Sequence, residues 1–306
     1  MDNKNNTTEM YEISETKRIL DYWTPERIAN ANPIQPPNIS KKNLMNQKNI
    51  SNTEPNTIIP PSTFNNLLIS DGEPYEVNAG EAPYESGGKI FFTVGEGDKA
   101  QDKYGSAQFV GHCQMVLTAA HCVRDNETGN YYNNLCFIKG FKLAEDKTVE
   151  GKKFVIEQAM TTDKYVGKFD IAYDYAFCRT KDSSPTWFGL QTGIPHEKLH
   201  AIGYPSNFGE GKVMQGVDGT KSTINNGVVR MKNNPMRHGN SGGAWIANLC
   251  KDGCQGSSQN LVVGLNSAHD DETAELGPFF APRGSHENIF DLFYTMLHIA
   301  NNPRCE

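Results

Sequence analysis

The chain has 306 residues, of which 37% are hydrophobic, with a mean hydropathy of −0.59 and a formal net charge of −7. This length suffices for one large all-β domain with additions or for two ordinary domains. Because no Lys/Arg-rich run occurs and no apolar segment approaches the length of a membrane span, we expect neither a nucleic-acid partner nor a membrane partner.

The first 85 residues differ in composition from the rest of the chain. Residues 10–22 carry a weak amphipathic helical pattern that one lysine interrupts. Thr24 is a good N-cap and Pro25 fits the first helical position, so a short helix should begin there. Residues 31–61 are rich in Asn, Pro, Ser and Thr, which is typical of a linker or an extended wrap.

Two interpretations of residues 1–85 remain open at this point. The segment is either a disordered tail or a pro-segment or arm that docks on the following domain through Tyr22, Trp23 and Ile28. The first residues contain no apolar signal-peptide core as written. The chain is therefore expected to stay inside the cell, to leave by another route, or to have its true start elsewhere.

From residue 87 onwards, short apolar segments alternate with turn residues. Many short strands at regular spacing predict a sandwich or a pair of barrels. Residues 286–301 instead show helical spacing, which predicts a terminal amphipathic helix packed on the β structure. The expected strands are residues 88–94, 107–110, 115–118, 135–138, 154–160, 171–178, 199–203, 228–232, 243–247 and 261–266.

A serine lies between glycines in Gly239-Asn240-Ser241-Gly242-Gly243. Glycines allow a tight turn, because they have no Cβ that would clash. Such a turn can expose the Ser241 hydroxyl and direct the backbone N–H groups of Gly239 and Ser241 at a developing oxyanion. An ordinary Gly-Ser loop would have the same sequence, so the stretch needs a base elsewhere in the chain.

The candidate base is His121, at the end of the apolar stretch Val116-Leu117-Thr118-Ala119-Ala120-His121-Cys122-Val123. Small residues before the histidine allow close backbone packing, which would hold the imidazole with little freedom. A histidine with a pKa near neutral is the natural base for a serine hydroxyl. A histidine beside an apolar strand can equally be a packed structural residue.

The stretch 117–122, followed much later by 239–243, resembles the trypsin-like serine peptidases of chymotrypsin fold. The resemblance is nearest to the secreted bacterial and fungal branch of V8-type, glutamyl endopeptidase-like enzymes. It implies an all-β domain at residues 86–306, with two six-stranded antiparallel β-barrels and a C-terminal α-helix, after an N-terminal extension at residues 1–85. Further stretches that support it are residues 22–27, 88–92, 201–205 and 263–267.

The resemblance implies a serine endopeptidase that works through His121, an aspartate and Ser241, with an acyl-enzyme and with no metal or cofactor. Its partner would be a peptide or protein substrate, and the protein would be a monomer. Asp170 and Asp174 both lie between the two motifs and would face the same side of a strand. Asp174 is preferred, because the residues after it continue as an apolar strand.

Four positions bear on activation and specificity. Asn240 stands where the trypsin branch has an aspartate that pairs with a new N-terminus, so the resemblance implies a site formed without that ion pair. Pro235 and Met236 would lie at the base and wall of the S1 pocket, and neither favours a Lys or Arg side chain. Asn266 replaces the histidine that recognises glutamate in glutamyl endopeptidases, so glutamate specificity is not implied.

Other polar residues lie close to this predicted S1 region. Arg237, His238 and His269 would either attract an acidic substrate or form a solvated rim. Ser267 and Ala268 are expected to offer backbone groups to the substrate strand. The candidate substrate-binding residues are Met236, Asn266, Ser267 and His269.

Seven cysteines occur, so at least one thiol has no intramolecular disulfide partner. Cys250 and Cys254 form either a small disulfide loop or two free thiols. The resemblance implies a partner for Cys122 near residues 105–106, where no cysteine stands, so Cys122 is expected to be free. Cys113 is expected in a hairpin turn. The missing bridge weakens the expectation of an oxidising compartment.

Three functions follow from these patterns. The first is an active serine endopeptidase, secreted and made as a zymogen. The second is a binding module that keeps the fold without turnover, although such a module has no need of every residue of the constellation. The third is a protease effector that a specialised secretion system delivers.

Overall fold

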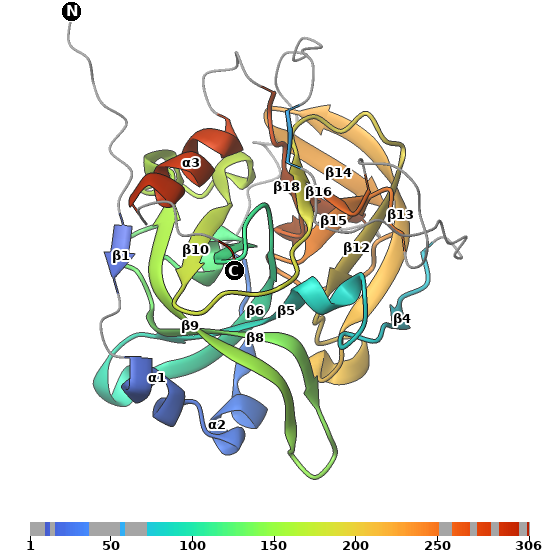
Figure 1. Cartoon of the computed structure of the whole chain (residues 1–306). Helices are drawn as coiled ribbons and strands as arrows, with labels where there is room; N and C mark the ends of the chain where they lie inside the picture. Colours follow the sequence, from blue (N-terminus) through green and yellow to red (C-terminus); the bar gives the residue numbers. More distant parts are fainter. Residues whose placement is uncertain are drawn as a thin grey trace, which may run out of the picture.

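The computed structural model describes residues 10–12, 16–36, 56–58, 72–250, 259–269, 274–282, 288–299 and 305. Two β-sheets lie side by side and form the body of the protein (Figure 1). The C-terminal helix α3 (Ile289–Ile299) packs on the first sheet, where Phe293 meets Phe177 with ring centroids 5.4 Å apart. The predicted terminal helix is therefore confirmed.

The first sheet closes into a barrel of antiparallel strands. Its neighbours follow the order β9-β10-β7-β6-β5-β8, and the pairing of β8 with β9 closes the ring. Phe109 packs between Phe137 and Phe154 at centroid distances of 5.4 and 5.0 Å, so aromatic side chains fill the interior. The strands are β5 (Gly87–Val94), β6 (Gln101–Phe109), β7 (Met115–Thr118), β8 (Asn133–Leu143), β9 (Val149–Thr161) and β10 (Ala176–Thr180).

The second sheet curves back on itself around Trp245. Its strands follow the order β18-β14-β13-β12-β15-β16, and β17 continues from β16 after two residues to pair with β18. The predicted all-β double barrel is thereby confirmed. The strands are β11 (Gly189–Gln191), β12 (Lys198–Gly203), β13 (Gln215–Asn225), β14 (Val228–Lys232), β15 (Ala244–Ala247), β16 (Leu261–Leu265), β17 (Ala268–His269) and β18 (Ala274–Pro278).

The strand prediction misses the short strands β11, β17 and β18, and it is wrong in two longer stretches. The expected strand at residues 171–178 begins only at Ala176, because Ile171–Tyr173 forms a 3₁₀-helix that the Asp170 side chain caps. The long strand β13 was not expected, since its glycines and charged residues hide the alternation and its second half is only partly buried. Both errors arise where tertiary pairing overrides a weak local pattern.

Residues 16–36, here called the arm, dock on the first barrel. They contain α1 (Thr16–Tyr22), α2 (Pro25–Asn30) and β2 (Asn32–Pro33), and Figure 1 shows both helices at the end of the barrel away from α3. Trp23 is fully buried, its Nε1 donates to the Asn134 carbonyl at 2.6 Å, and its ring meets Phe91 at 5.4 Å. These residues are therefore not a disordered tail.

The N-terminal segment departs from the predicted elements in one place, ahead of the arm. The helix that begins after Thr24 is confirmed, with the Thr24 hydroxyl accepting from the Arg27 N–H at 3.3 Å. The expected helix at residues 10–22 is wrong in its first part, because β1 (Met10–Glu12) pairs with the edge of β9. Two further short segments, β3 (Thr57–Ile58) and β4 (Tyr75–Glu76), pair with β11 and β13 of the second sheet.

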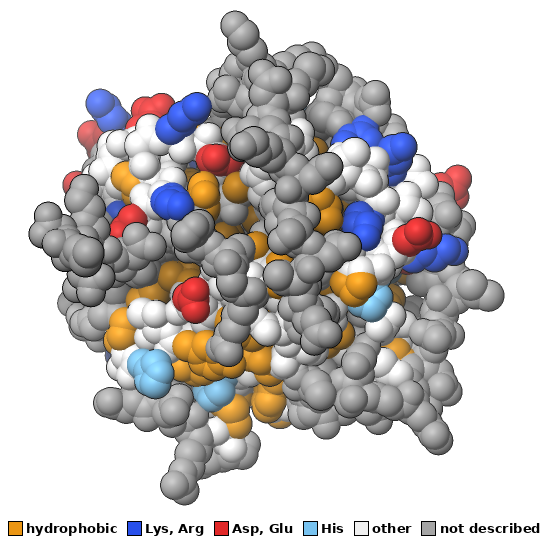
Figure 2. Space-filling model, turned by 90° about the horizontal axis from the view of Figure 1, so that it is seen from above, with side chains coloured by type: hydrophobic (Ala, Val, Ile, Leu, Met, Phe, Trp, Pro, Cys, Tyr) orange, Lys and Arg blue, Asp and Glu red, His pale blue; other side chains and the backbone are white. Residues whose placement is uncertain are grey.

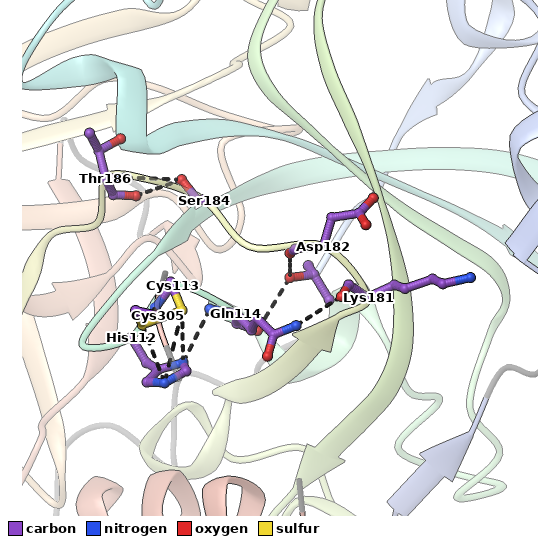
Figure 3. The surroundings of a disulfide bond; sticks show 9 residues. His112, Cys113, Gln114, Lys181, Asp182, Ser184, Thr186 and Cys305 are labelled. Atoms are coloured by element: carbon purple, nitrogen blue, oxygen red, sulfur yellow. Dashed lines mark hydrogen bonds between the residues drawn. A yellow bond between two sulfur atoms is a disulfide. The ribbon is translucent and has the colours of Figure 1, made fainter. Parts of the chain in front are cut away.

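A disulfide joins Cys113, in the β6–β7 turn, to Cys305, with the two Cα atoms 5.6 Å apart. Figure 3 shows the His112 ring against this bond, with Nε2 3.4 Å from the Cys305 sulfur. Cys250 is also disulfide-bonded, and Cys254 lies outside the described residues. Cys122 is free and buried, as expected.

The surface of the described residues is mixed in character. On the face that Figure 2 shows, hydrophobic side chains are visible between separated Lys/Arg and Asp/Glu side chains. Tyr294 and Ile299 of α3 are 38% and 40% exposed. Among the described residues, no helix has the length and apolar character needed to cross a membrane.

Replacing Trp23 by alanine should test whether the arm is part of the folded domain. Large-to-small substitution of a fully buried tryptophan typically lowers the free energy of unfolding by about 3–5 kcal/mol. We expect a loss in this range by denaturant unfolding. Leu20→Ala, at a position of α1 that is 37% exposed, serves as the control and should change stability by less than about 0.5 kcal/mol. Equal stability of the wild type and Trp23→Ala would contradict the docked arm.

Candidate active site

The turn at residues 239–243 connects β14 to β15 and requires its glycines. Gly239 and Gly242 have φ values of +93° and +86°, in the region that favours glycine. A Cβ on Gly242 would lie 2.2 Å from Thr118 Oγ1 and 2.3 Å from the Ser106 carbonyl. The turn is thus pressed against the first barrel at the strand that leads to His121.

Backbone hydrogen bonds hold this turn from both barrels. The Ser106 N–H in β6 donates to the Ser241 carbonyl at 2.7 Å. On the other side, the Gly242 N–H donates to the Asn266 carbonyl at 2.7 Å, and the Asn266 N–H donates to the Gly243 carbonyl at 2.9 Å. Ser241 is buried, and its position depends on how the two barrels dock.

His121 and Asp174 lie side by side in the first barrel. His121 belongs to the 3₁₀-helix Ala120–Cys122, directly after β7. Its Nδ1 is 2.7 Å from Asp174 Oδ2, and its backbone N–H donates to Asp174 Oδ1 at 2.9 Å. Asp170 does not reach this histidine; it accepts from the Ala172 N–H at 3.0 Å. Of the two aspartates, only Asp174 is placed to orient the imidazole.

Ser267 contributes a contact that the sequence analysis did not foresee. Its hydroxyl donates to Asp174 Oδ2, and its N–H donates to the Leu276 carbonyl at 3.0 Å. The N–H of Ser267 is therefore engaged in the second barrel, and its side chain buttresses the carboxylate. The sequence offered no local signal for this contact, because 93 residues separate the two partners.

The surroundings of His121 act on its pKa in opposite directions. Burial lowers the pKa of His121, whereas the adjacent Asp174 carboxylate and then the Cys122 sulfur raise it, and the net shift is above the ordinary value of 6.5. Among the described residues, His121 Nε2 has no hydrogen-bond partner. Within the same residues, neither the Gly239 nor the Ser241 N–H donates to a backbone carbonyl. These groups are available to a ligand at the turn.

The predicted S1 residues have mixed surroundings. Met236 is fully buried in the apolar cluster around Trp245. The Asn266 side chain accepts from Trp245 Nε1 at 2.7 Å and from Asn234 Nδ2 at 3.0 Å. Its own Nδ2 donates to the Ile202 carbonyl at 3.1 Å. The polar atoms of Asn266 therefore link strands of the second barrel to one another.

His238 and His269 lie together, with ring centroids 5.4 Å apart in an edge-to-face arrangement. Burial, and then the nearby Arg237, lower the pKa of His238. Opposite His269 in the β17–β18 register lies Glu275, which is 1% exposed. The sequence analysis did not single out Glu275, because β18 was not among the predicted strands.

No protein-family model and no curated protein sequence matches the chain. Solved structures are similar to it. The protease Anisep from Arthrobacter nicotinovorans is 20% identical with a TM-score of 0.56, covering 73% of this chain and 98% of that chain. A Glu endopeptidase is 17% identical with a TM-score of 0.56, covering 77% and 100%. The thermostable serine protease AL20 from an extremophilic microorganism is 21% identical with a TM-score of 0.50, covering 64% and 92%. These likenesses and the closed first barrel show the chymotrypsin-like fold that the motifs predicted.

Asp174→Asn should lower the pKa of His121, because it removes the charge that raises this pKa while keeping the side-chain shape. NMR titration of the imidazole measures the change. A raised pKa stabilises the folded state fully below about pH 6.5, and this stabilisation is lost as the pH rises through the raised value. The difference in unfolding free energy between wild type and variant should therefore shrink as the pH increases above about 6.5.

Asp170→Asn is the matched control for this measurement, since Asp170 contacts Ala172 and not His121. It should leave the pKa of His121 unchanged. An unchanged pKa in Asp174→Asn would show that the carboxylate does not govern the imidazole.

Asn266→Ala should destabilise the second barrel, because it leaves the buried donors of Trp245 and Asn234 unsatisfied. Each such group costs about 1–3 kcal/mol, so for the two donors we expect a loss of roughly 2–6 kcal/mol in the free energy of unfolding. Denaturant unfolding measures it, with exposed Thr223→Ala in β13 as the control. Unchanged stability would mean that Asn266 serves the substrate site alone.

Proposed function

We propose that the protein is a serine endopeptidase in which His121, Asp174 and Ser241 form the catalytic triad. The observation that carries this proposal is the buried His121–Asp174 pair, with Nδ1 2.7 Å from the carboxylate and Nε2 without a partner among the described residues. The glycine turn that carries Ser241 packs against the same strand end. The similar solved structures include proteases, which supports the same activity.

The proposed reaction follows from these positions. Ser241 Oγ attacks the carbonyl carbon of the scissile bond, and His121 Nε2 accepts its proton. The backbone N–H groups of Gly239 and Ser241 donate to the oxyanion that forms. His121 then protonates the leaving amine, and a water molecule hydrolyses the acyl-enzyme by the reverse route. Asp174 holds the imidazole tautomer and stabilises its charge.

The substrate in this proposal is an extended peptide or protein segment, bound by a monomer without metal or cofactor. Met236, Asn266, Ser267 and His269 remain our candidates for the S1 region. The buried Asn266 and Ser267 would act through the barrel framework, whereas the half-buried His269 is open to direct contact.

We also propose that the enzyme works in an oxidising compartment after export. The Cys113–Cys305 disulfide supports this, because such bonds persist mainly outside the reducing cytosol. The absence of a disulfide at Cys122 weakened the expectation of an oxidising compartment, whereas the Cys113–Cys305 disulfide supports it.

Ser241→Ala tests the proposed activity. Loss of the nucleophile of a triad typically lowers kcat by about a million-fold. We expect the wild-type chain to react with a fluorophosphonate probe and to hydrolyse a peptide library, and the variant to do neither. Ser222→Ala, on β13, is the matched control and should behave as the wild type.

Two outcomes would contradict the assignment. Peptide hydrolysis by purified Ser241→Ala would exclude this serine as the nucleophile. A folded wild-type chain that the probe does not label would favour a binding module with the same fold.

A further inference from the structure

The arm reaches the edge of β6 that leads to the proposed nucleophile. β2 pairs with β6 in parallel, with Asn32 opposite Lys103 and Pro33 opposite Tyr104. The Ile34 N–H donates to the Tyr104 carbonyl at 2.9 Å. Two residues further along β6, Ser106 binds the Ser241 carbonyl. The hydrogen bond from Ile34 to Tyr104 therefore lies two residues along β6 from the hydrogen bond between Ser106 and Ser241.

Tyr104 also contacts the proposed oxyanion site. A Cβ on Gly239 would lie 2.5 Å from Tyr104 Cε2, so the ring covers the start of the nucleophile turn. An extended residue spans about 3.3 Å, which places the Tyr104 backbone roughly 7 Å along β6 from Ser106. The residues of a bound peptide just beyond the scissile bond extend from Ser241 over a similar distance, so they would lie beside the backbone of Tyr104.

A bound peptide must extend from Ser241 in two directions. On one side of the turn lies the Asn266–Ser267 connection to β17, which we assign to the acyl part of the substrate. On the other side lies β6, where the leaving part of the substrate would meet the backbone of Tyr104. That carbonyl already accepts from Ile34, and one strand edge pairs with one strand at a time.

Several contacts fasten the arm to β6 and to neighbouring strands of the first barrel. Arg27 and the Tyr22 hydroxyl both reach the Asp102 carboxylate of β6, at 2.9 and 2.8 Å. Trp23 is buried in the barrel, and Lys153 donates to its carbonyl at 2.7 Å. Because these contacts are intramolecular, β2 has a high effective concentration at the edge and competes well with a free peptide.

We propose that the arm is an autoinhibitory strand that occupies the leaving-group side of the active site and leaves the acyl side open. This inference rests on the proposed serine peptidase activity. Substrates with several residues beyond the scissile bond must displace β2 before they react. Substrates with a small leaving group need not displace it.

Ile34→Pro tests the proposal, since it removes the N–H that binds Tyr104 and leaves the triad untouched. Hydrolysis of labelled casein reports peptides that extend past the scissile bond, and hydrolysis of a nitrophenyl ester reports substrates that do not. We expect the ratio of the casein rate to the ester rate to rise about three- to tenfold, the range of one neutral hydrogen bond. Ile34→Ala keeps the N–H and is the matched control, with the ratio of the wild type.

A second variant guards against a local folding defect in Ile34→Pro. Arg27→Ala removes a partly exposed anchor at Asp102 and should raise the same ratio in the same direction. An unchanged ratio in both variants, with ester hydrolysis intact, would overturn the autoinhibitory role while leaving the peptidase standing. A wild-type chain that neither hydrolyses the ester nor reacts with fluorophosphonate would instead remove the proposed function, and this inference with it.

Discussion

The candidate site depends on one constraint, the hydrogen bonds that hold the turn around Ser241 between the two β-sheets. Ser106 binds this turn from the first barrel, and Asn266 binds it from the second. His121 and Asp174 belong to the first barrel alone. Ser241 and His121 are therefore placed relative to each other only when the barrels dock, so the proposed chemistry depends on the interface as much as on the motifs.

Lys89 is a buried basic residue at the interface between the two barrels. This lysine is buried, and its Nζ donates to the Gly211 carbonyl at 2.7 Å while lying 3.5 Å from the Tyr104 ring centroid. Burial lowers the pKa of Lys89 well below its ordinary value. The Tyr204 hydroxyl adds a second link, since it donates to the Phe141 carbonyl at 2.8 Å. Hydrogen bonds inside an aromatic cluster thus join the barrels close to the turn at residues 239–243, and polar groups in such surroundings tolerate few alternative geometries.

The sequence predicted the local features of the site and missed those that depend on distant pairing. The glycine turn and the histidine after β7 could be located because their backbone requirements lie within a few residues. The structure places Asp174, and not Asp170, beside His121. The two aspartates were expected on one face of a strand, but a 3₁₀-helix lies between them in the chain. Contacts such as Ser267 with Asp174 join residues far apart in sequence, so only the assembled fold reveals them.

The bond between Cys113 and Cys305 has a consequence for the order of assembly. The two cysteines are 192 residues apart, so the ribosome must complete the second barrel and α3 before they can meet. All six strands of the first barrel are synthesised before Cys305, so they can pair without this crosslink. A chain that stops short of Cys305 would leave the Cys113 thiol open to a different partner.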